Sequence, residues 1–168
     1  MSDKKKKRIL IVSDTHGRDA NLKRVLELEK DRDMLVHLGD IEGSEDFIRE
    51  NSNCPICMVA GNNDYFTTLN TEVLFNIGPY KVLATHGHTY YISLGYEVVA
   101  SEAKAQGAHI VMCGHTHKPV VLEKNGVTII NPGSLSYPRQ EGRLPSYVIM
   151  EIDENDKIVY TIKYLNEN

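Results

Sequence analysis

Five short apolar runs in this 168-residue chain each end in a cluster of polar residues and glycine. A short apolar run bounded by turn residues is typical of a strand buried in a sheet. The five clusters are Ser13-Asp14-Thr15-His16-Gly17, Gly39-Asp40, Gly61-Asn62-Asn63-Asp64, Thr85-His86-Gly87-His88 and Gly114-His115-Thr116-His117. In open α/β sheets, ligands bind outside the carboxyl ends of the strands. We therefore expect the five clusters to converge on one rim.

The segments between the first runs predict helices that pack on a sheet. Residues 22–29 and 96–103 each place apolar side chains at helical spacing, with charged residues on the other side. Ser44 precedes two acidic residues, the pattern of a helix N-cap and an acidic first turn. With strands over 9–12, 34–38 and 56–60, the first half of the chain predicts a βαβαβ order.

The second half is mostly strand. Asn125-Gly126 predicts a two-residue hairpin turn. Strands are expected over 72–77, 81–85, 110–113, 120–124, 127–130, 147–152 and 157–164. No repeat, linker or low-complexity tract divides the sequence, so we expect one domain over residues 1–168. Two sheets with helices outside them, an α/β arrangement, would accommodate both halves.

The composition limits the classes of function. A formal net charge of −4 gives no global basic field, which disfavours nonspecific coating of DNA or RNA. The apolar run after Arg8 is too short for a signal peptide, and no run approaches the length of a membrane helix. We expect a cytoplasmic protein without a membrane span.

The odd number of cysteines argues against a disulfide framework, and we expect structural roles for Cys54 and Cys57.

The residue types in the clusters are ones that commonly bind metal ions in proteins. Imidazole, carboxylate and amide oxygen together suit Mn, Fe, Zn, Ni or Mg. Asp14 and His16 are two residues apart, as are His115 and His117. Extended residues with this spacing point to the same side, so each pair is expected to reach one metal or to straddle two. The glycines beside them would let the backbone turn sharply.

Taken in order, the clusters resemble the motifs of the calcineurin-like metallophosphoesterases. The small size and the segment Asn131-Pro132-Gly133-Ser134 are similar to the compact, YfcE-like bacterial and archaeal phosphodiesterase branch. The resemblance extends from Asp14 to Ser134, most of the chain. It implies a four-layer αββα sandwich of two mixed sheets flanked by helices.

The resemblance also implies a site with two divalent metal ions, with Mn expected first and Mg, Ni, Fe or Zn also open. One ion would be held by Asp14, His16, Asp40 and His117, and the other by Asp40, Asn62, His86 and His115. Asp40 would bridge the two ions. The implied reaction is hydrolysis of a phosphodiester by a hydroxide that bridges the metals, with Asp40 and Asn62 taking part in catalysis.

One position departs from the family pattern. Many relatives carry His directly after the motif Asn, where it protonates the leaving group, whereas this chain carries Asn63. An amide supplies no proton near neutral pH. The family pattern would have Asp64 orient a His at position 63, and this chain has no His there. His88 is the candidate substitute acid; the alternative is that it supports the metal ligands.

Other polar and aromatic residues have simpler interpretations. We expect His37 to be a packed or hydrogen-bonded strand residue and His109 to lie at the surface. Segment 131–134 is expected to shape the rim of the site. Arg139 would either reach a substrate phosphate or be solvated on its loop. Tyr65 and Phe66 are expected to pack beneath the chain; the alternative is that they line the substrate cleft.

Three functions remain open at this stage. The first is a phosphodiesterase acting on a small phosphodiester or a nucleotide-like substrate. The second is a phosphomonoesterase or nucleotide pyrophosphatase with the same site. The third is a non-catalytic protein-binding scaffold, as in the retromer subunit that shares the fold but lacks a complete ligand set; here every implied ligand position holds a competent residue. A symmetric homodimer is a reasonable expectation, although no segment identifies its interface.

Overall fold

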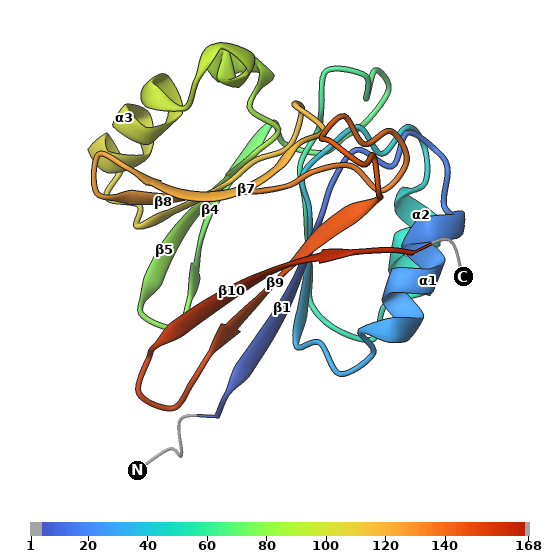
Figure 1. Cartoon of the computed structure of the whole chain (residues 1–168), viewed down its shortest axis with the longest axis horizontal. Coiled ribbons are helices and arrows are strands. Elements are labelled where there is room, and N and C mark those ends of the chain that lie inside the picture. The colour runs from blue at the N-terminus through green and yellow to red at the C-terminus, as the bar shows by residue number, and fades with distance from the viewer. Residues whose placement is uncertain (1–4, 167–168) are drawn as a thin grey trace.

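Two mixed sheets face each other in the computed structural model, which describes residues 5–166 (Figure 1). The first has the strand order β10-β9-β1-β2-β3 and the second the order β4-β5-β6-β8-β7. The first sheet consists of β1 (Lys7–Val12), β2 (Met34–His37), β3 (Ile56–Met58), β9 (Ser146–Ile152) and β10 (Ile158–Tyr164). The second consists of β4 (Glu72–Ile77), β5 (Tyr80–Thr85), β6 (Ile110–Met112), β7 (Pro119–Lys124) and β8 (Val127–Pro132).

Parallel strands form the centre of each sheet. β1, β2 and β3 pair in parallel, as do β5, β6 and β8, while the other neighbours pair antiparallel. Helix α1 (Ala20–Leu28) joins β1 to β2, α2 (Glu45–Glu50) joins β2 to β3, and α3 (Glu97–Ala105) lies between β5 and β6. The parallel strands therefore end at one edge of each sheet, where ligands bind in such folds.

Alternation of side chains along the strands creates three buried layers. In β1, Ile9 and Ile11 pack between the two sheets, whereas Leu10 packs against α1 and α2. In β5, Val82 belongs to the layer between the sheets and Leu83 to the layer under α3. Since successive strand residues point to opposite faces, continuous apolar runs build both layers at once.

The result is the expected αββα sandwich. Helices α1 and α2 cover the outer face of the first sheet, and α3 covers the outer face of the second (Figure 1). No helix in the described residues is both long and apolar enough to cross a bilayer. The Asn125-Gly126 hairpin is confirmed: both residues have positive φ, as a type I′ turn requires, and Lys124 pairs with Val127.

Two local details differ from the prediction, although α2 does follow Ser44 as its N-cap residue and has the expected acidic first turn. The strand expected over 56–60 ends at Met58, because Ala60 bonds to Asn70 outside the sheet. Ser44 does precede α2, but its hydroxyl makes no capping bond and instead donates to Asp19 at 2.7 Å. A hydrogen bond from Ser44 to the loop before α1 has replaced the local cap.

Candidate metal centre

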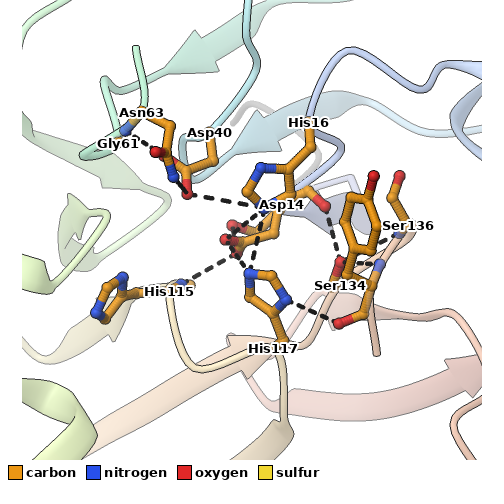
Figure 2. Close-up of polar contacts among 12 residues, drawn as sticks. Asp14, His16, Asp40, Gly61, Asn63, His115, His117, Ser134 and Ser136 are labelled. Atoms are coloured by element: carbon orange, nitrogen blue, oxygen red, sulfur yellow. Dashed lines mark hydrogen bonds and ion pairs between the residues drawn. The ribbon is translucent and has the colours of Figure 1, made fainter. Parts of the chain in front are cut away.

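The loops after β1, β2, β3, β5 and β6 meet at one edge of the sandwich. Asp14, fully buried, lies at their centre, with Asp40, His16, His115 and His117 around it (Figure 2). His86 joins them from β5, and Asn62 from the loop after β3. The expected convergence of the five loops is therefore present.

One group of side chains has the geometry of a cation site. Asp14, His16, Asp40 and His117 each offer one ligand atom, and these atoms all lie within 4.8 Å of one another. Asp14 Oδ1 is 3.0 Å from His117 Nε2, and the Nε2 atoms of His16 and His117 are 3.2 Å apart. Four donors this close can surround a single ion.

A second group adjoins the first across Asp40. His86 Nε2 lies 3.4 Å from Asp40 Oδ2, and His115 Nδ1 lies 3.1 Å from Asn62 Oδ1. The rings of His86 and His115 are 5.2 Å apart between centroids. Asp40 Oδ2 is also 3.8 Å from His16 Nε2, so this carboxylate faces both groups.

Backbone carbonyls fix the orientation of two imidazoles. His86 Nδ1 donates to the carbonyl oxygen of Leu38 at 2.6 Å, and His117 Nδ1 donates to that of Tyr137 at 2.8 Å. A carbonyl only accepts, so each Nδ1 carries the hydrogen. In the neutral ring, Nε2 then presents a lone pair to the site, the arrangement expected of a histidine that ligates a metal.

Two buried atoms at the centre have no hydrogen-bond partner among the described residues. They are Asp14 Oδ1 and His86 Nε2. The other oxygen of Asp14 is satisfied, since Oδ2 accepts from Ser13 Oγ at 2.5 Å and from His115 N at 3.0 Å. Buried polar atoms are normally paired because leaving them unpaired costs free energy. Lone pairs of Asp14 and His86 that face each other fit a bound divalent cation.

The electrostatics of the site also favour positive charge. Burial opposes ionisation of Asp14, but the nearby imidazoles of His117 and His86 outweigh it and lower the pKa of Asp14. Burial likewise opposes ionisation of Asp40, but His86 and Asn63 lower its pKa. Burial tends to lower the pKa of His86, yet Asp40 and Asp14 raise it. The carboxylates therefore stay ionised and attract a proton or a metal cation.

The backbone at the site differs from the extended chain expected for the paired residues. Asp14 and His16 have φ of 56° and 50°, and His115 and His117 have φ of 66° and 59°. The side chains still converge, but they do so through left-handed turns. Asp40 has the same conformation, with φ of 55°. Non-glycine residues rarely adopt it, and such strain concentrates at functional sites.

Two glycines allow the loops to approach each other. A Cβ on Gly61 would lie 2.2 Å from Asp40 Oδ1, and one on Gly114 would lie 2.1 Å from Ser13 Oγ. Neither glycine has a positive φ. Their role is therefore close approach to neighbouring side chains and not the expected sharp turn. Gly17, Gly39 and Gly87 do have positive φ, in agreement with the expectation.

Asn63 and Asp64, in the loop after β3, form hydrogen bonds that hold this loop against Asp40 and the loop after β2. Asn63 donates from its backbone N to Asp40 Oδ1 at 2.9 Å and from its amide Nδ2 to Asp40 Oδ2 at 3.0 Å. Asp64 accepts from the backbone N of Ile41, Glu42 and Gly61. Asp64 thus joins the loops after β2 and β3, a role that the sequence motif did not suggest.

Of the three remaining histidines, His37 and His109 lie outside the candidate metal centre and His88 lies beside it. His37 is buried, bonds to Thr15 Oγ1 at 3.0 Å, and has its pKa lowered by burial to about 4, which confirms it as a structural residue. His109 is exposed, as expected. The ring centroid of His88 lies 5.5 Å from that of His86 and 6.2 Å from that of His115. Its buried Nδ1 has no hydrogen-bond partner within residues 5–166.

The loop after β8 contributes contacts that sequence reasoning missed. Ser134 is buried, and its hydroxyl donates to the carbonyl oxygen of Asp14 and accepts from the backbone N of Tyr137. Arg139 and Arg143 are exposed on the same loop, beside His16 and His117. The Asn-Pro-Gly-Ser signal pointed to this loop, but not to its hydrogen bond with Asp14.

Of the two interpretations of the loop aromatics, packing beneath the chain is wrong. Tyr65 is 79% exposed and Phe66 fully so, which excludes packing beneath the chain. Together with Glu42 and Glu45 they line a cavity of about 310 Å³ that adjoins Asn63. The loop after β3 is tied down through Asp64, which leaves these two rings facing outward.

Comparison with known proteins identifies the same family. A family model for the calcineurin-like phosphoesterase superfamily domain matches residues 8–155. YsnB of Bacillus subtilis, named a probable metallophosphoesterase, is 35% identical over 149 residues that cover 88% of this chain and 85% of the relative. A protein of Methanocaldococcus jannaschii named phosphodiesterase is 30% identical over 146 residues, covering 75% of this chain and 82% of the relative.

Solved structures share the architecture. A Streptococcus pneumoniae protein described as a predicted phosphoesterase superposes with a TM-score of 0.78 at 25% identity, over 95% of this chain and 98% of the other. A Vps29 variant from Entamoeba histolytica superposes with a TM-score of 0.75 at 22% identity, over 95% and 99% of the two chains. The second likeness is one of fold alone.

Proposed function

Because this chain belongs to the calcineurin-like phosphoesterase superfamily, we propose that it is a phosphodiesterase that acts with two divalent metal ions. The observation that carries the proposal is a pair of buried atoms without hydrogen-bond partners among residues 5–166. They are Asp14 Oδ1 and His86 Nε2, which lie 3.8 Å apart, and Asp40 Oδ2 lies 3.4 Å from the second. A relative named phosphodiesterase, at 30% identity, favours the diester as substrate.

The proposed ligand sets follow the two groups of side chains. Asp14, His16, Asp40 and His117 hold one ion, and Asn62, His86 and His115, together with Asp40, hold the other. Two ions bound there would acidify an attacking water between them and neutralise the charge on the phosphate oxygens. Mn is the first metal to test. Histidine and carboxylate ligands also suit Mg, Ni, Fe and Zn, which are tested next.

The chain's own residues orient the site. Asn63 holds both oxygens of Asp40, and Leu38 and Tyr137 hold the rings of His86 and His117 through their carbonyls. Groups fixed before substrate arrives need little reorganisation during the reaction. Asn63 cannot donate a proton to the leaving group, so we propose His88 for that role.

A matched pair of variants tests the proposal. The chelator-treated protein is supplied with each metal in turn and assayed on an aryl phosphodiester and the corresponding monoester. We expect metal-dependent cleavage that prefers the diester, and a loss of at least about 1,000-fold in Asp40→Ala, since both ion sites lose a ligand. Asp46→Ala, an equally small change on the exposed surface of α2, should retain full activity.

The outcomes separate the alternatives. A preference for the monoester would favour the phosphomonoesterase or nucleotide pyrophosphatase. A shared fold does not by itself specify catalysis. A folded protein that cleaves neither ester with any metal would therefore favour the binding scaffold.

A further inference from the structure

A groove of about 740 Å³ opens directly beside the candidate metal centre. His16 and His117 line it on the side of the metal centre, and Tyr137, Arg139 and Arg143 line it on the side of the loop after β8. Glu42 also lines the groove, with its carboxylate 3.5 Å from His16 Nδ1. The groove therefore joins the metal ligands to two guanidinium groups that the proposed chemistry does not use.

The loop that carries these arginines is anchored to the metal centre. The backbone N of Arg139 donates to the carbonyl oxygen of His117 at 3.0 Å, and His117 Nδ1 donates to the carbonyl oxygen of Tyr137 at 2.8 Å. Ser134 Oγ adds a bond of 2.8 Å to the carbonyl oxygen of Asp14. Three hydrogen bonds thus fix the start of the loop against two proposed ligands, so the backbone of Arg139 is held beside them.

Neither guanidinium has a partner among residues 5–166. Arg139 and Arg143 make only backbone hydrogen bonds there, whereas Arg8 and Arg49 form ion pairs with carboxylates. The neighbouring Arg18 stacks on Tyr137, with its Cζ 4.9 Å from the ring centroid. Arginine binds phosphate oxygens through two parallel hydrogen bonds, so two unpaired arginines in a groove are suited to an anionic group.

We propose that Arg139, assisted by Arg143, binds a second phosphate of the substrate, next to the phosphate that is cleaved. This inference rests on the proposed function, in which the two cations neutralise the scissile phosphate. The arginines then supply charge for a further group. The substrate class is a nucleotide-like phosphodiester that carries an additional phosphate, such as a short oligonucleotide with a terminal phosphate.

Kinetics on a matched substrate pair test the inference. The substrates are a thymidine dinucleotide with and without a terminal phosphate, and the variants are Arg139→Gln and, as the control, Arg49→Gln on α2. Charge-assisted hydrogen bonds contribute about 1.5–3 kcal/mol, so Arg139→Gln should raise KM for the phosphorylated dinucleotide about 10- to 100-fold. KM for the unphosphorylated one should change less than about 3-fold, and Arg49→Gln should change neither. Equal effects of Arg139→Gln on both substrates would overturn the proposal.

A binding measurement does not depend on diester cleavage. Calorimetry compares thymidine 3′,5′-bisphosphate with thymidine 5′-monophosphate on the metal-loaded protein, with chromatography to verify that both ligands stay intact. The wild type should bind the bisphosphate at least about 10-fold more tightly, and Arg139→Gln should lose this preference. Equal affinities in the wild type would refute the second phosphate site. Tighter binding of the bisphosphate by a protein that cleaves no diester would refute the proposed phosphodiesterase activity and would still support the arginine site.

Discussion

At the scale of single residues, the site differs from its family pattern at Asn63. Its amide holds the carboxylate of Asp40 but has no proton to give. His88 lies near two proposed ligands, with its ring centroid 5.5 Å from that of His86 and 6.2 Å from that of His115. Protonation of the leaving group matters most when that group is a poor one, which provides a way to test His88.

We expect His88→Ala to slow cleavage of an alkyl phosphodiester about 100-fold and cleavage of a nitrophenyl diester less than about 5-fold, because a good leaving group needs no proton. The measurement is kcat for both substrates at metal saturation. His109→Ala, on the surface at the start of β6, is the control. Equal slowing of both substrates would assign His88 to positioning of the metal ligands.

The sequence predicted the identity of the clustered residues better than their conformation. Motif order and strand ends were sufficient to bring Asp14, Asp40 and His117 together. The left-handed backbone at Asp14 and His16 was not predictable, since it is imposed by bonds from their backbone N atoms to the carbonyl oxygens of Gly39 and Asp40. The exposure of Phe66 likewise depends on a distant contact, that of Asp64 with the loop after β2.

At the scale of elements, the parallel strands bring the ligand loops to one edge, and glycines let those loops touch. Gly61 is the tightest contact between the loops after β2 and β3: an added Cβ would lie 2.2 Å from Asp40 Oδ1 and 2.4 Å from Asp40 N. No real Cβ tolerates such distances, so one loop must move away from the other.

Gly61→Ala should therefore weaken metal binding by at least about 10-fold and lower kcat/KM accordingly, because displacement of Asp40 affects both ion sites. Metal titration by calorimetry measures the affinity. Gly142→Ala is the matched control: it meets nothing within 4 Å, and its positive φ should cost only about 1 kcal/mol of stability. Unchanged metal affinity in Gly61→Ala would contradict the proposed packing of Asp40.

The elements themselves followed from apolar runs, turn residues and helical spacing. The strand ladder over Glu72–Ile77 and the hairpin at Asn125-Gly126 were predicted within a residue, because local chemistry determines them. Two 3₁₀ helices, His88–Tyr90 and Ile92–Leu94, were not predicted. They turn about Tyr91, at φ of 53°, and bury Ile92 under α3, so tertiary packing determines them.

At the scale of the whole molecule, an ionic cluster ties the C-terminal end of α1 to the first sheet. Glu29, 5% exposed, accepts from Tyr147 Oη and from Lys163 Nζ, both at 2.8 Å, and forms an ion pair with Arg8. Burial opposes ionisation of Glu29, but its hydrogen bonds to Lys163, Arg8 and Tyr147 lower its pKa below the usual 4.5.

A carboxyl group whose pKa is lower in the folded than in the unfolded protein stabilises the fold at any pH above its unfolded-state pKa. This stabilisation is lost as the pH falls through its folded-state pKa. Glu29→Gln should therefore lower the free energy of unfolding by about 2 kcal/mol at pH 7, and this difference from the wild type should shrink below about pH 4.5. Urea unfolding in the presence of chelator measures both. Glu27→Gln, exposed on α1, should change little. A difference that does not decrease as the pH falls below about 4.5 would contradict the ionic origin.

The number of metal ions per folded chain tests the two-metal site most directly. Native mass spectrometry would count ions after the chelator-treated protein is saturated with Mn²⁺ and desalted. We predict two ions in the wild type and in Asp46→Ala. We predict one in His86→Ala and one in His117→Ala, because each variant removes a ligand from a different group. A folded wild type that retains one ion or none would contradict the two-metal site.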